Sequence, residues 1–371
     1  MKIGLLGYGT VGKGVYDLLL NSEHTIVKIL DNKDQSINII TKDFDEVINS
    51  DIDTIIECLP NIPVAYEYVA KALNKGINVI TSNKALVANH FEELYELTTK
   101  NHCYITYEAS VAGGIPWLHA LCDLKANDKI NSFMGIFNGT TNYILDRMFK
   151  ENIDFDSCLN SAIELGYAEK NYSSDVDGID TKYKIFITHN LINNSICDLD
   201  DIVCYGIRYI NSQVISYCKA NNLNCKLIGY GDRNNLFVMP MLVSNEHILA
   251  KVDLNNNATI VNTKNMNNLS FIGQGAGRYP TANAICLDVK RPLDSMSIDK
   301  HSYITNDYQM SYFLSEKVID DKYIIQSNDQ GYITKKLSIK KIKELIGDKE
   351  VFVGGISDQG WYIWGKQCCG C

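Results

Sequence analysis

Short apolar runs and amphipathic stretches alternate along the first hundred residues of the chain. The apolar run at 3–6 precedes a stretch in which Val11, Val15, Leu18 and Leu19 recur at helical spacing. Further strands are expected at 25–30, 53–59, 77–83 and 103–110, and further helices at 62–76 and 90–101. Strands and helices that alternate in this way predict a parallel sheet joined by right-handed crossovers.

Three glycines separate the first predicted strand from the first predicted helix. In this G-x-G-x-x-G arrangement, Gly7 makes the tight turn, Gly9 lets the backbone approach a pyrophosphate and Gly12 allows close packing of helix on strand. The free N–H groups at the helix start, which includes Thr10 and Val11, would face the anion. The pattern predicts a dinucleotide cofactor; a glycine-rich turn of another α/β fold is the alternative.

Asp31 ends the second predicted strand, nineteen residues after Gly12. An acid at this place accepts hydrogen bonds from the adenosine ribose hydroxyls, which favours NAD over NADP. Lys28 and Lys33 are close in sequence, however, and Lys33 could meet the 2′-phosphate of NADP. A loop aspartate that only caps a turn is the structural alternative.

Composition narrows the class of protein. The 371 residues suffice for two or three domains, and 46% hydrophobic and 21% charged residues are ordinary globular values. A net charge of -9 argues against nucleic acid or an anionic membrane as the main partner. No apolar run approaches the roughly 18 residues of a membrane span, and the N-terminus lacks signal-peptide features, so we expect a cytoplasmic protein.

The chain has twelve cysteines. Nine are scattered singly, and we expect them to be reduced and mostly buried thiols. The other three stand in the C-terminal stretch KQCCGC, which has no second Cys or His pair nearby to complete a zinc site. We expect a flexible tail with exposed thiols there, and a redox switch or intersubunit disulfide is the alternative.

The stretch LGYAEKNYSSDVDGIDTKYK at 165–184 gathers carboxylates and lysines. A helix is predicted from Gly178 onward, with a buried stripe formed by Ile179, Tyr183, Phe186 and Ile187. Asp180 and Lys184, at i and i+4, then share a face, whereas Lys182 points elsewhere and is expected to face solvent. Asp177, or Asp175 just outside the helix, can cap it.

The residue spacing in this stretch limits its chemistry. The glycine and glutamate of an EF-hand calcium loop are not at their required positions, and the stretch holds no Cys or His for zinc. A solvated charged turn and a catalytic group of charges both remain open.

Five motifs together resemble the homoserine dehydrogenase family, in its order and spacing, over residues 1 to about 290. They are NKALVA (83–88), YEASVAGGIP (107–116), GIFNGTTNYIL (135–145), the charged stretch at 165–184, and GQGAGRYPTANAICLDV (273–289). The resemblance implies NAD(P)-dependent interconversion of L-homoserine and L-aspartate 4-semialdehyde, in threonine, methionine and isoleucine biosynthesis. A Rossmann reductase of another semialdehyde or keto acid is one alternative, and a nucleotide-sensing regulator is another.

The resemblance also implies roles for the charged stretch. Lys184 matches the family's proposed general acid/base lysine, and Asp180 matches the aspartate that holds it. Glu169 and Asp175 match acids that bind the amino and hydroxyl end of the substrate.

Other implied site residues lie on different segments. Lys84 would lie near the nicotinamide and the substrate, where a cation suits a carboxylate or a developing alkoxide. Thr140, at a predicted strand-to-helix junction, would bind the amino-acid end of the substrate, with plain helix capping as the alternative. Gly275, in the last of the five motifs, would contribute to binding the cofactor.

The resemblance also implies a monovalent cation, usually sodium. It would be held by the backbone carbonyls of Glu108, Val111, Gly113 and Ile115. A glycine-bearing loop that merely closes the nucleotide site is the alternative reading of this segment.

The expected fold class is α/β. A Rossmann-type parallel sheet is expected over residues 1–134, and an α+β catalytic and dimerisation domain over 135–265. Residues 266–300 would return to the nucleotide domain. Residues 301–371 would form a small α+β module of strand, strand, helix, strand and strand, either a reduced ACT-like unit or an unrelated cap. The family implies a homodimer or a higher homo-oligomer.

The chain departs from the family pattern at one loop. Many family members carry a Gly-Gly pair where this sequence reads CLPNIP at 58–63. The loop beneath the nicotinamide is therefore expected to have a different shape, which makes the cofactor preference less secure.

Overall fold

The computed structural model describes residues 1–33, 37–169, 171–293 and 300–356. The chain forms two compact units. The first consists of residues 1–123, 190–196 and 274–300, and the second of 124–189, 197–273 and 301–371. The boundary expected at 134/135 falls inside strand β7 (Ile130–Ile136), which belongs to the second unit.

The first unit is built on a six-stranded sheet in the order β3-β2-β1-β4-β5-β6. Its neighbouring strands pair in parallel, as the alternating pattern predicted. Strand order reverses between β1 and β4, and the crevice at the carboxyl ends of strands at such a point is where these sheets bind ligands. The strands are β1 (Lys2–Leu6), β2 (Thr25–Leu30), β3 (Ile40–Thr41), β4 (Thr54–Glu57), β5 (Asn78–Thr81) and β6 (Ile105–Thr106).

Helices of the first unit follow the amphipathic stretches. The three predicted helices are α1 (Thr10–Leu19), α3 (Ile62–Asn74) and α5 (Phe91–Asn101). Two short helices were not predicted, α2 (Phe44–Ile48) and α4 (Lys84–Asn89), because five or six residues are too few to show a helical period.

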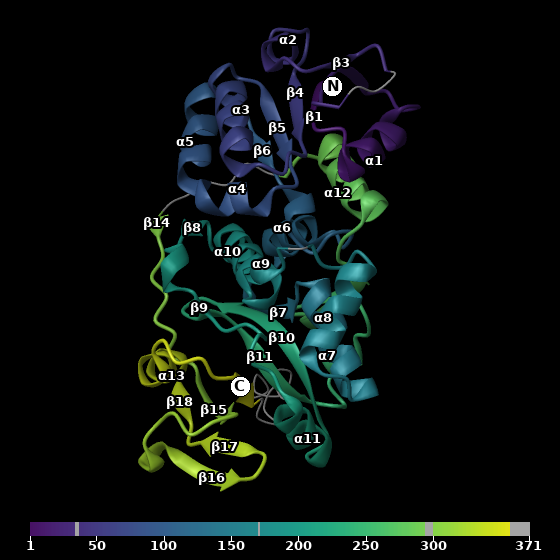
Figure 1. Cartoon of the computed structure of the whole chain (residues 1–371). Coiled ribbons are helices and arrows are strands. Elements are labelled where there is room, and N and C mark those ends of the chain that lie inside the picture. Colours follow the sequence, from purple (N-terminus) through teal and green to yellow (C-terminus); the bar gives the residue numbers. More distant parts are fainter. Residues whose placement is uncertain (34–36, 170, 294–299, 357–371) are drawn as a thin grey trace. The chain divides into compact units, whose positions relative to one another are not determined.

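A segment from late in the sequence completes the first unit. Helix α12 (Arg278–Lys290), drawn in green, lies beside α1, drawn in purple (Figure 1). The two helices touch at Gly14, where an added Cβ would lie 2.9 Å from the Cβ of Ala282. Helix α6 (Trp117–Asn127) begins in this unit, and the 3-10 turn η1 (Glu108–Ser110) precedes it.

The second unit is built on an eleven-stranded mixed sheet. Its main path runs β13-β12-β7-β10-β11-β19-β15-β17-β16. Strands of this path include β10 (Leu223–Asp232), β11 (Leu236–Ser244), β12 (Asn256–Thr263) and β13 (Asn267–Gln274). β9 (Val203–Cys204) lies off the path and pairs with β11. The helices are α7 (Gly139–Glu151), α8 (Phe155–Glu164), α9 (Ser173–Val176), α10 (Ile179–Asn193) and α11 (Ser212–Ala220).

Helix α10 is more enclosed than a one-sided stripe. Every residue from Lys184 to Leu191 is buried, whereas Ile179 and Tyr183 of the expected stripe are only half-buried. The helix packs closely on β10, because a Cβ at Gly229 would lie 2.5 Å from Ile185. A helix that is buried on most sides carries no exposed polar stripe, so its sequence pattern does not reveal which side faces the core.

The C-terminal strands continue the sheet of the second unit. β19 (Val353–Ile356) pairs in parallel with β11, and Met241 stands opposite Gly355. Three of the four expected strands and the helix are present, whereas the short β17 and β18 were missed. The last expected strand, GWYIWG at 360–365, lies outside the described residues. The elements are β15 (Gln309–Leu314), β16 (Ile324–Asn328), β17 (Gly331–Thr334), β18 (Leu337–Ser338) and α13 (Ile339–Ile346); β8 (Ser195–Ile196) and β14 (Lys300–His301) complete the strands.

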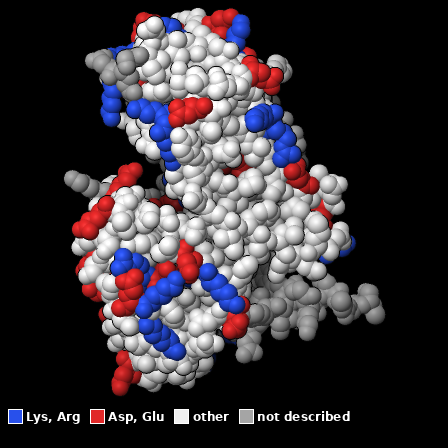
Figure 2. Space-filling model, turned by 90° about the vertical axis from the view of Figure 1, so that its right-hand side faces the viewer, with Lys and Arg blue, Asp and Glu red and all other residues white. Residues whose placement is uncertain are grey.

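The described cysteines are reduced, as the composition predicted, and charges of both signs are mixed on the face drawn in Figure 2. Figure 2 shows Lys and Arg interspersed with Asp and Glu over the face drawn. All nine described cysteines are free thiols, and five of them are buried. No helix within the described part of the chain is long and apolar enough to cross a membrane. The three cysteines of the CCGC tail lie outside the described residues.

Candidate active site

The glycine loop of the first unit has the shape of a pyrophosphate cradle. Gly7 has a φ of +94°, and a Cβ at Gly12 would lie 1.9 Å from the Gly7 carbonyl oxygen, so larger residues are excluded from both positions. A Cβ at Gly9 would meet no atom within 4 Å, so the space above it is open. Gly9 is the N-cap of α1 and gives it no side-chain cap, which leaves the N–H groups of Thr10 and Val11 available to an anion.

Asp31 is held at the end of β2 by two backbone amides. Its Oδ2 accepts from the N–H of Tyr8 at 2.8 Å, and its Oδ1 accepts from the N–H of Lys33 at 2.8 Å. The expected turn capping is therefore present, and it also orients the carboxylate beside the glycine loop. Lys28 lies 3.3 Å from Glu46 in an ion pair, and Lys33 is exposed.

In the second unit, Lys184 and Asp180 form the ion pair that their spacing predicted. Lys184 Nζ lies 2.8 Å from Asp180 Oδ2, one turn away on α10. The two residues are only 8% and 3% exposed. Lys184 Nζ also donates to the backbone carbonyl of Phe137 at 2.6 Å. A buried ion pair needs such additional hydrogen bonds to offset the loss of water. Lys182 is half-buried, which differs from the solvent-facing position expected for it.

Asn138 joins the two aspartates of the site, and the sequence analysis did not single it out. Its Nδ2 donates to Asp175 Oδ1 at 2.7 Å and to Asp180 Oδ2 at 2.9 Å. Its Oδ1 accepts from the N–H of Thr141 at 2.8 Å and so caps α7. The available signal was an asparagine directly before a predicted helix start, which is a favoured N-cap.

A second unpredicted residue supports the same site. Asn257, on β12, donates through Nδ2 to the Phe137 carbonyl at 3.1 Å. The Phe137 oxygen therefore receives hydrogen bonds from both Lys184 and Asn257. Two donors on one carbonyl fix the oxygen in place, and that oxygen helps to place the lysine ammonium group.

Lys84 belongs to the first unit, at the carboxyl end of β5. It is the first residue of α4, and Asn83 caps this helix by accepting from the N–H of Leu86 at 3.1 Å. Lys84 is half-buried. The carboxyl end of a parallel strand is where a sheet of this kind places groups that meet a ligand.

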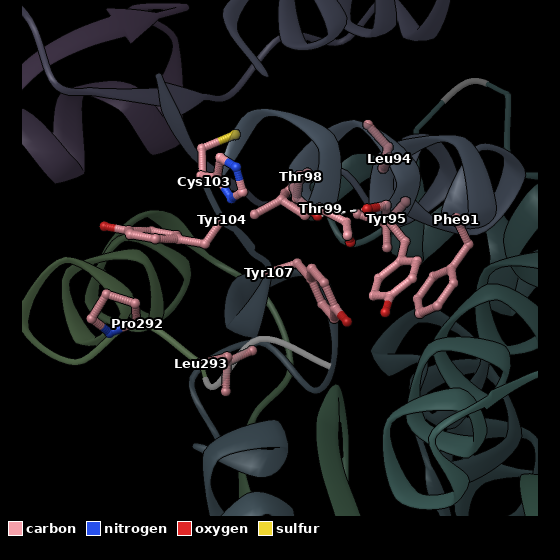
Figure 3. A pocket seen from close by; sticks show the side chains of 13 residues that line it. Phe91, Leu94, Tyr95, Thr98, Thr99, Cys103, Tyr104, Tyr107, Pro292 and Leu293 are labelled. Atoms are coloured by element: carbon pink, nitrogen blue, oxygen red, sulfur yellow. Dashed lines mark hydrogen bonds between the residues drawn. The ribbon is translucent and has the colours of Figure 1, made fainter. Parts of the chain in front are cut away.

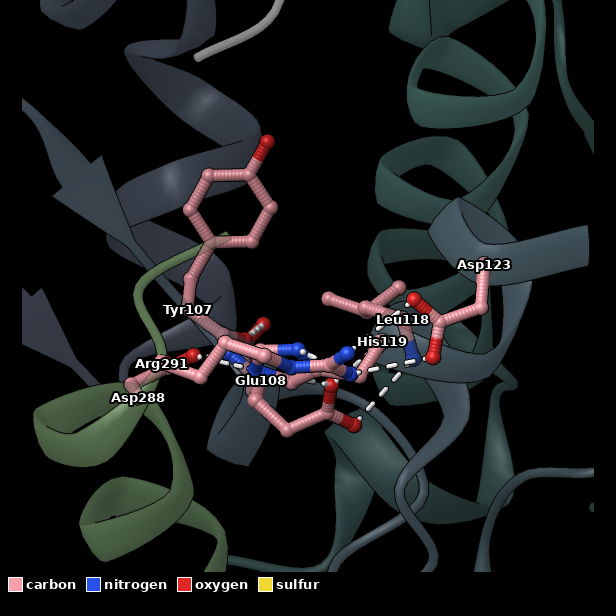
Figure 4. Close-up of polar contacts among 8 residues, drawn as sticks. Tyr107, Glu108, Leu118, His119, Asp123, Asp288 and Arg291 are labelled. Atoms are coloured by element: carbon pink, nitrogen blue, oxygen red, sulfur yellow. Dashed lines mark hydrogen bonds and ion pairs between the residues drawn. The ribbon is translucent and has the colours of Figure 1, made fainter. Parts of the chain in front are cut away.

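The Glu108 side chain caps the N-terminal end of α6 (Figure 4). Its carboxylate accepts from the N–H of Leu118 at 3.1 Å and from that of His119 at 2.7 Å, so it satisfies two orphan donors of the first turn. Burial raises the pKa of Glu108 to about 7. Asp288 Oδ2 accepts from the Glu108 N–H at 2.9 Å, and Asp288 Oδ1 lies 2.9 Å from His119 Nε2. Burial also raises the pKa of Asp288.

The loop after Glu108 turns sharply and meets the start of the last family motif. Ala112 and Gly113 have successive φ values of +59° and +62°. A Cβ at Gly113 would lie 2.2 Å from the carbonyl oxygen of Gly275, and Gly114 N–H donates to the Gln274 carbonyl at 3.0 Å. Only glycine permits this close approach of two backbones.

Four carbonyls of this loop form the set expected to hold an alkali cation. The Glu108 carbonyl accepts from the Val111 N–H at 3.2 Å, and the Ile115 carbonyl accepts from the Trp117 N–H at 2.8 Å. Each carbonyl oxygen has two lone pairs, so these contacts leave capacity for a further partner. A set of neutral oxygen donors fits a hard cation by its chemistry.

Comparison with known proteins identifies the family. Residues 7–108 match the model of the homoserine dehydrogenase NAD binding domain, and residues 116–289 match the homoserine dehydrogenase model. The homoserine dehydrogenase of Synechocystis sp. is 34% identical over 313 residues, which cover 78% of this chain and 72% of the relative. This chain belongs to the homoserine dehydrogenase family.

Further relatives agree with the assignment to homoserine dehydrogenases. The enzyme of Bacillus subtilis is 33% identical over 333 residues, which cover 83% of this chain and 77% of the relative. A solved homoserine dehydrogenase from Thiobacillus denitrificans has a TM-score of 0.85 over 96% of this chain and 98% of its own, and its 24% identity makes this a likeness of fold. The chain is thus an NAD(P)-dependent oxidoreductase that acts on homoserine, and neither alternative raised by the sequence is needed.

Two residues implied by the homoserine dehydrogenase motifs, Thr140 and Glu169, differ in their local contacts, and Asp177 was expected only as a possible helix cap. Thr140 Oγ1 donates to the Tyr167 carbonyl at 2.5 Å, so its hydroxyl proton is engaged. Glu169 is exposed and makes no hydrogen bond or ion pair within the described part of the chain. Asp177 does not serve as the expected cap, because Arg208 holds its carboxylate through Nε and Nη2, each at 2.7 Å.

A separate pocket of about 690 Å³ lies beside α5 and β6 in the first unit (Figure 3). Tyr95, Tyr104 and Tyr107 are among the side chains that surround it. Its lining contains no Asp, Glu, Lys or Arg among the described residues. The proposed general acid/base Lys184 and its partner Asp180 are not among the residues that line this pocket.

Proposed function

We propose that Lys184 is the general acid and base with which this chain interconverts L-homoserine and L-aspartate 4-semialdehyde. The observation that supports this role is the buried contact of its Nζ with Asp180 and with the Phe137 carbonyl. A lysine held in this way has a defined position, and the carboxylate beside it favours its charged form. Proton transfer from a positioned side chain contributes roughly 10²- to 10⁴-fold to a rate.

Lys184 and Asp180 carry out the proton transfer that accompanies the hydride transfer. A bound nicotinamide cofactor supplies the hydride in one direction and accepts it in the other. In the direction of reduction, Lys184 Nζ gives a proton to the oxygen on which negative charge develops. In the direction of oxidation, neutral Lys184 removes the hydroxyl proton. Asp180 orients the lysine and stabilises its charged form.

Other side chains bind the substrate. Lys84 stabilises the developing alkoxide or anchors the substrate carboxylate. Asp175 and Glu169 bind the amino and hydroxyl end. Thr140 contributes at the start of α7, where its hydroxyl oxygen can still accept a hydrogen bond while its proton goes to Tyr167.

The dinucleotide is NAD in preference to NADP. The backbone of Gly7, Gly9 and Gly12, the helix start at Thr10 and Val11, and the Gly275 segment would hold its phosphates and ribose. Asp31 supports the preference, because its carboxylate is fixed by two amides and would repel a 2′-phosphate. Lys33 is exposed close to this carboxylate and is the feature that favours NADP instead.

A monovalent cation and self-association complete the proposal. The carbonyls of Glu108, Val111, Gly113 and Ile115 would hold sodium and brace the loop, outside the proton chemistry. The second unit supplies the surface for a homodimer.

Oxidation of L-homoserine, followed at 340 nm with NAD and with NADP, tests the substrate and the cofactor together. L-aspartate and malate serve as control substrates and should give no signal. Lys184→Met should lower kcat by about 100-fold or more, and Asp180→Asn should lower kcat while NAD affinity stays near the wild-type value. Lys182→Met, two residues away, is the matched control and should keep its activity. A Lys184→Met enzyme with more than a few per cent of the wild-type kcat would exclude the proposed role.

A further inference from the structure

Glu57 is a fully buried carboxylate at the carboxyl end of β4, and no step of the proposed mechanism uses it. Its Oε2 accepts from the hydroxyl of Thr81 at 2.5 Å, and its Oε1 accepts from the N–H of Leu59 at 2.6 Å. Thr81 ends β5 and stands opposite Glu57 in the sheet. One carboxylate thus joins the ends of two neighbouring strands.

The contacts continue into a closed ring through Asn83. The Asn83 N–H donates to Thr81 Oγ1 at 2.9 Å, and Asn83 Nδ2 donates to the Leu59 carbonyl at 3.4 Å. Because the Thr81 oxygen accepts from Asn83 while its proton goes to Glu57, the ring is complete when Glu57 is ionised. If Glu57 were protonated, one of these contacts would lack either a hydrogen to donate or an oxygen to accept it.

The ring lies where the sheet binds its ligand. On its other side β4 pairs with β1, and Glu57 stands opposite Leu6, directly before the glycine loop. A Cβ at Gly7 would lie 2.7 Å from the carbonyl of Cys58, so the residue after Glu57 touches that loop. Asn83 also caps α4, whose first residue is Lys84. Lys84 is therefore attached to the ring by a single peptide bond.

We propose that Glu57 is a positioning residue, whose ionised carboxylate holds the Asn83 turn so that Lys84 meets the negative charge of the substrate. The inference rests on the proposed function, because it takes Lys84 to be the residue that meets that charge. Glu57 directly precedes the CLPNIP loop at 58–63, and its hydrogen bond from the Leu59 N–H holds the start of that loop. Asn61 of this loop caps α3 by accepting from the Val64 N–H at 3.2 Å, so both ends of the loop are anchored.

Burial gives the carboxylate an unusual affinity for protons. It raises the pKa of Glu57 to about 7, against the lowering effect of hydrogen bonds from Thr81, Leu59 and Asn83. The titratable group beside it is the Cys58 thiol, whose pKa is raised by burial and further by the charge of Glu57. Assays at pH 8 therefore keep the ring in its ionised form.

The test compares Thr81→Val with Thr81→Ser at pH 8, and Glu57→Gln with Glu67→Gln. Valine removes the hydroxyl at nearly constant volume, whereas serine keeps it; Glu67 is an exposed residue that pairs with Lys71 on α3. We expect Thr81→Val and Glu57→Gln to lower kcat/KM for homoserine by about tenfold or more, with NADH affinity within about threefold of wild type. Thr81→Ser and Glu67→Gln should behave as wild type.

Two results would overturn the proposal. Equal kcat/KM in Thr81→Val and Thr81→Ser would mean that the ring does not position Lys84. An equal loss of NADH affinity and kcat/KM would mean that the ring shapes the dinucleotide loop instead. If Glu57→Gln does not fold, the comparison of Thr81→Val with Thr81→Ser still tests the proposal. A wild-type enzyme that fails to oxidise homoserine would reject the proposed function itself, and the two failures are thereby distinguished.

Discussion

The side-chain amide of Asn138 donates a hydrogen bond to Asp180 across 2.9 Å, although 42 residues separate the two in the sequence. The same amide nitrogen donates to Asp175, and the amide oxygen caps α7. One short side chain thus connects a proposed substrate ligand, the partner of Lys184 and a helix start. Its contribution to catalysis can be separated from its contribution to folding.

Asn138→Asp should keep the helix cap and lose the activity. Aspartate accepts from the Thr141 N–H as asparagine does, but it donates no hydrogen bond and adds a third carboxylate beside Asp175 and Asp180. We expect kcat/KM for homoserine to fall by at least about tenfold. Asn138→Ala should lose the activity and also about 1 kcal/mol of stability, because it removes the cap. Steady-state kinetics and thermal unfolding measure both effects, and wild-type kcat/KM in Asn138→Asp would refute the role of the amide.

Asp31→Ala should shift the cofactor preference toward NADP. The substitution removes the acceptor for the ribose hydroxyls and the charge that repels a 2′-phosphate, while Lys33 remains. We expect kcat/KM for NAD to fall by about tenfold and that for NADP to rise. Glu23→Ala, at an exposed site of the same unit, serves as the control and should change neither value. A parallel fall with both cofactors would show that Asp31 only shapes the turn.

Lys226 should make stability depend on pH in the alkaline range. It lies fully buried on β10, and its Nζ donates to the Asn142 side chain at 3.0 Å and to the Val252 carbonyl at 2.7 Å. Burial lowers the pKa of Lys226 from 10.5 to about 8. Between these pH values the unfolded chain binds the proton more strongly, so this group's destabilising contribution is complete below pH 8 and vanishes above pH 10.5.

The measurement is the free energy of unfolding of wild type and of Lys226→Met from pH 7 to pH 10.5. The difference, wild type minus variant, should rise with pH by about 3 kcal/mol in all. Exposed Lys264 provides the control, and Lys264→Met should show no such slope. A difference that stays constant with pH would mean that burial does not lower the pKa of Lys226 below its value in the unfolded chain.

Asp288 and Asp123, both drawn in Figure 4, should contribute very differently to the free energy of unfolding. Asp288 is fully buried and lies 2.9 Å from His119, whereas Asp123 is exposed and pairs with Arg291 at 3.1 Å. Asp288→Ala should cost about 3 kcal/mol because it leaves buried donors unpaired. Asp123→Ala should cost less than about 1 kcal/mol, since an exposed pair is screened by water. Chemical denaturation compares the two variants, and equal losses would contradict the role of burial.

Local sequence patterns were sufficient for part of the fold. The parallel sheet of the first unit, the glycine loop and α10 were predicted because strand and helix periods repeat within a few residues. The short α2, α4, β17 and β18 were missed, since elements of two to six residues carry no readable period. The burial of α10 from Lys184 to Leu191 was also missed, because its polar residues are satisfied inside the protein: Lys184 donates to the Phe137 carbonyl, and Thr188 donates to the Lys184 carbonyl one turn earlier.

The sequence by itself determined the pairing of Asp180 with Lys184, because both lie on one helix and the helical period alone brings them together. Only the tertiary structure decided what surrounds that pair. Asn138 and the Phe137 carbonyl come from a strand-to-helix junction more than forty residues away, and Asn257 comes from β12, 120 residues beyond Phe137. Asp177 likewise meets Arg208 instead of capping α10. Contacts across such separations depend on how the sheet and helices pack, and no local period encodes them.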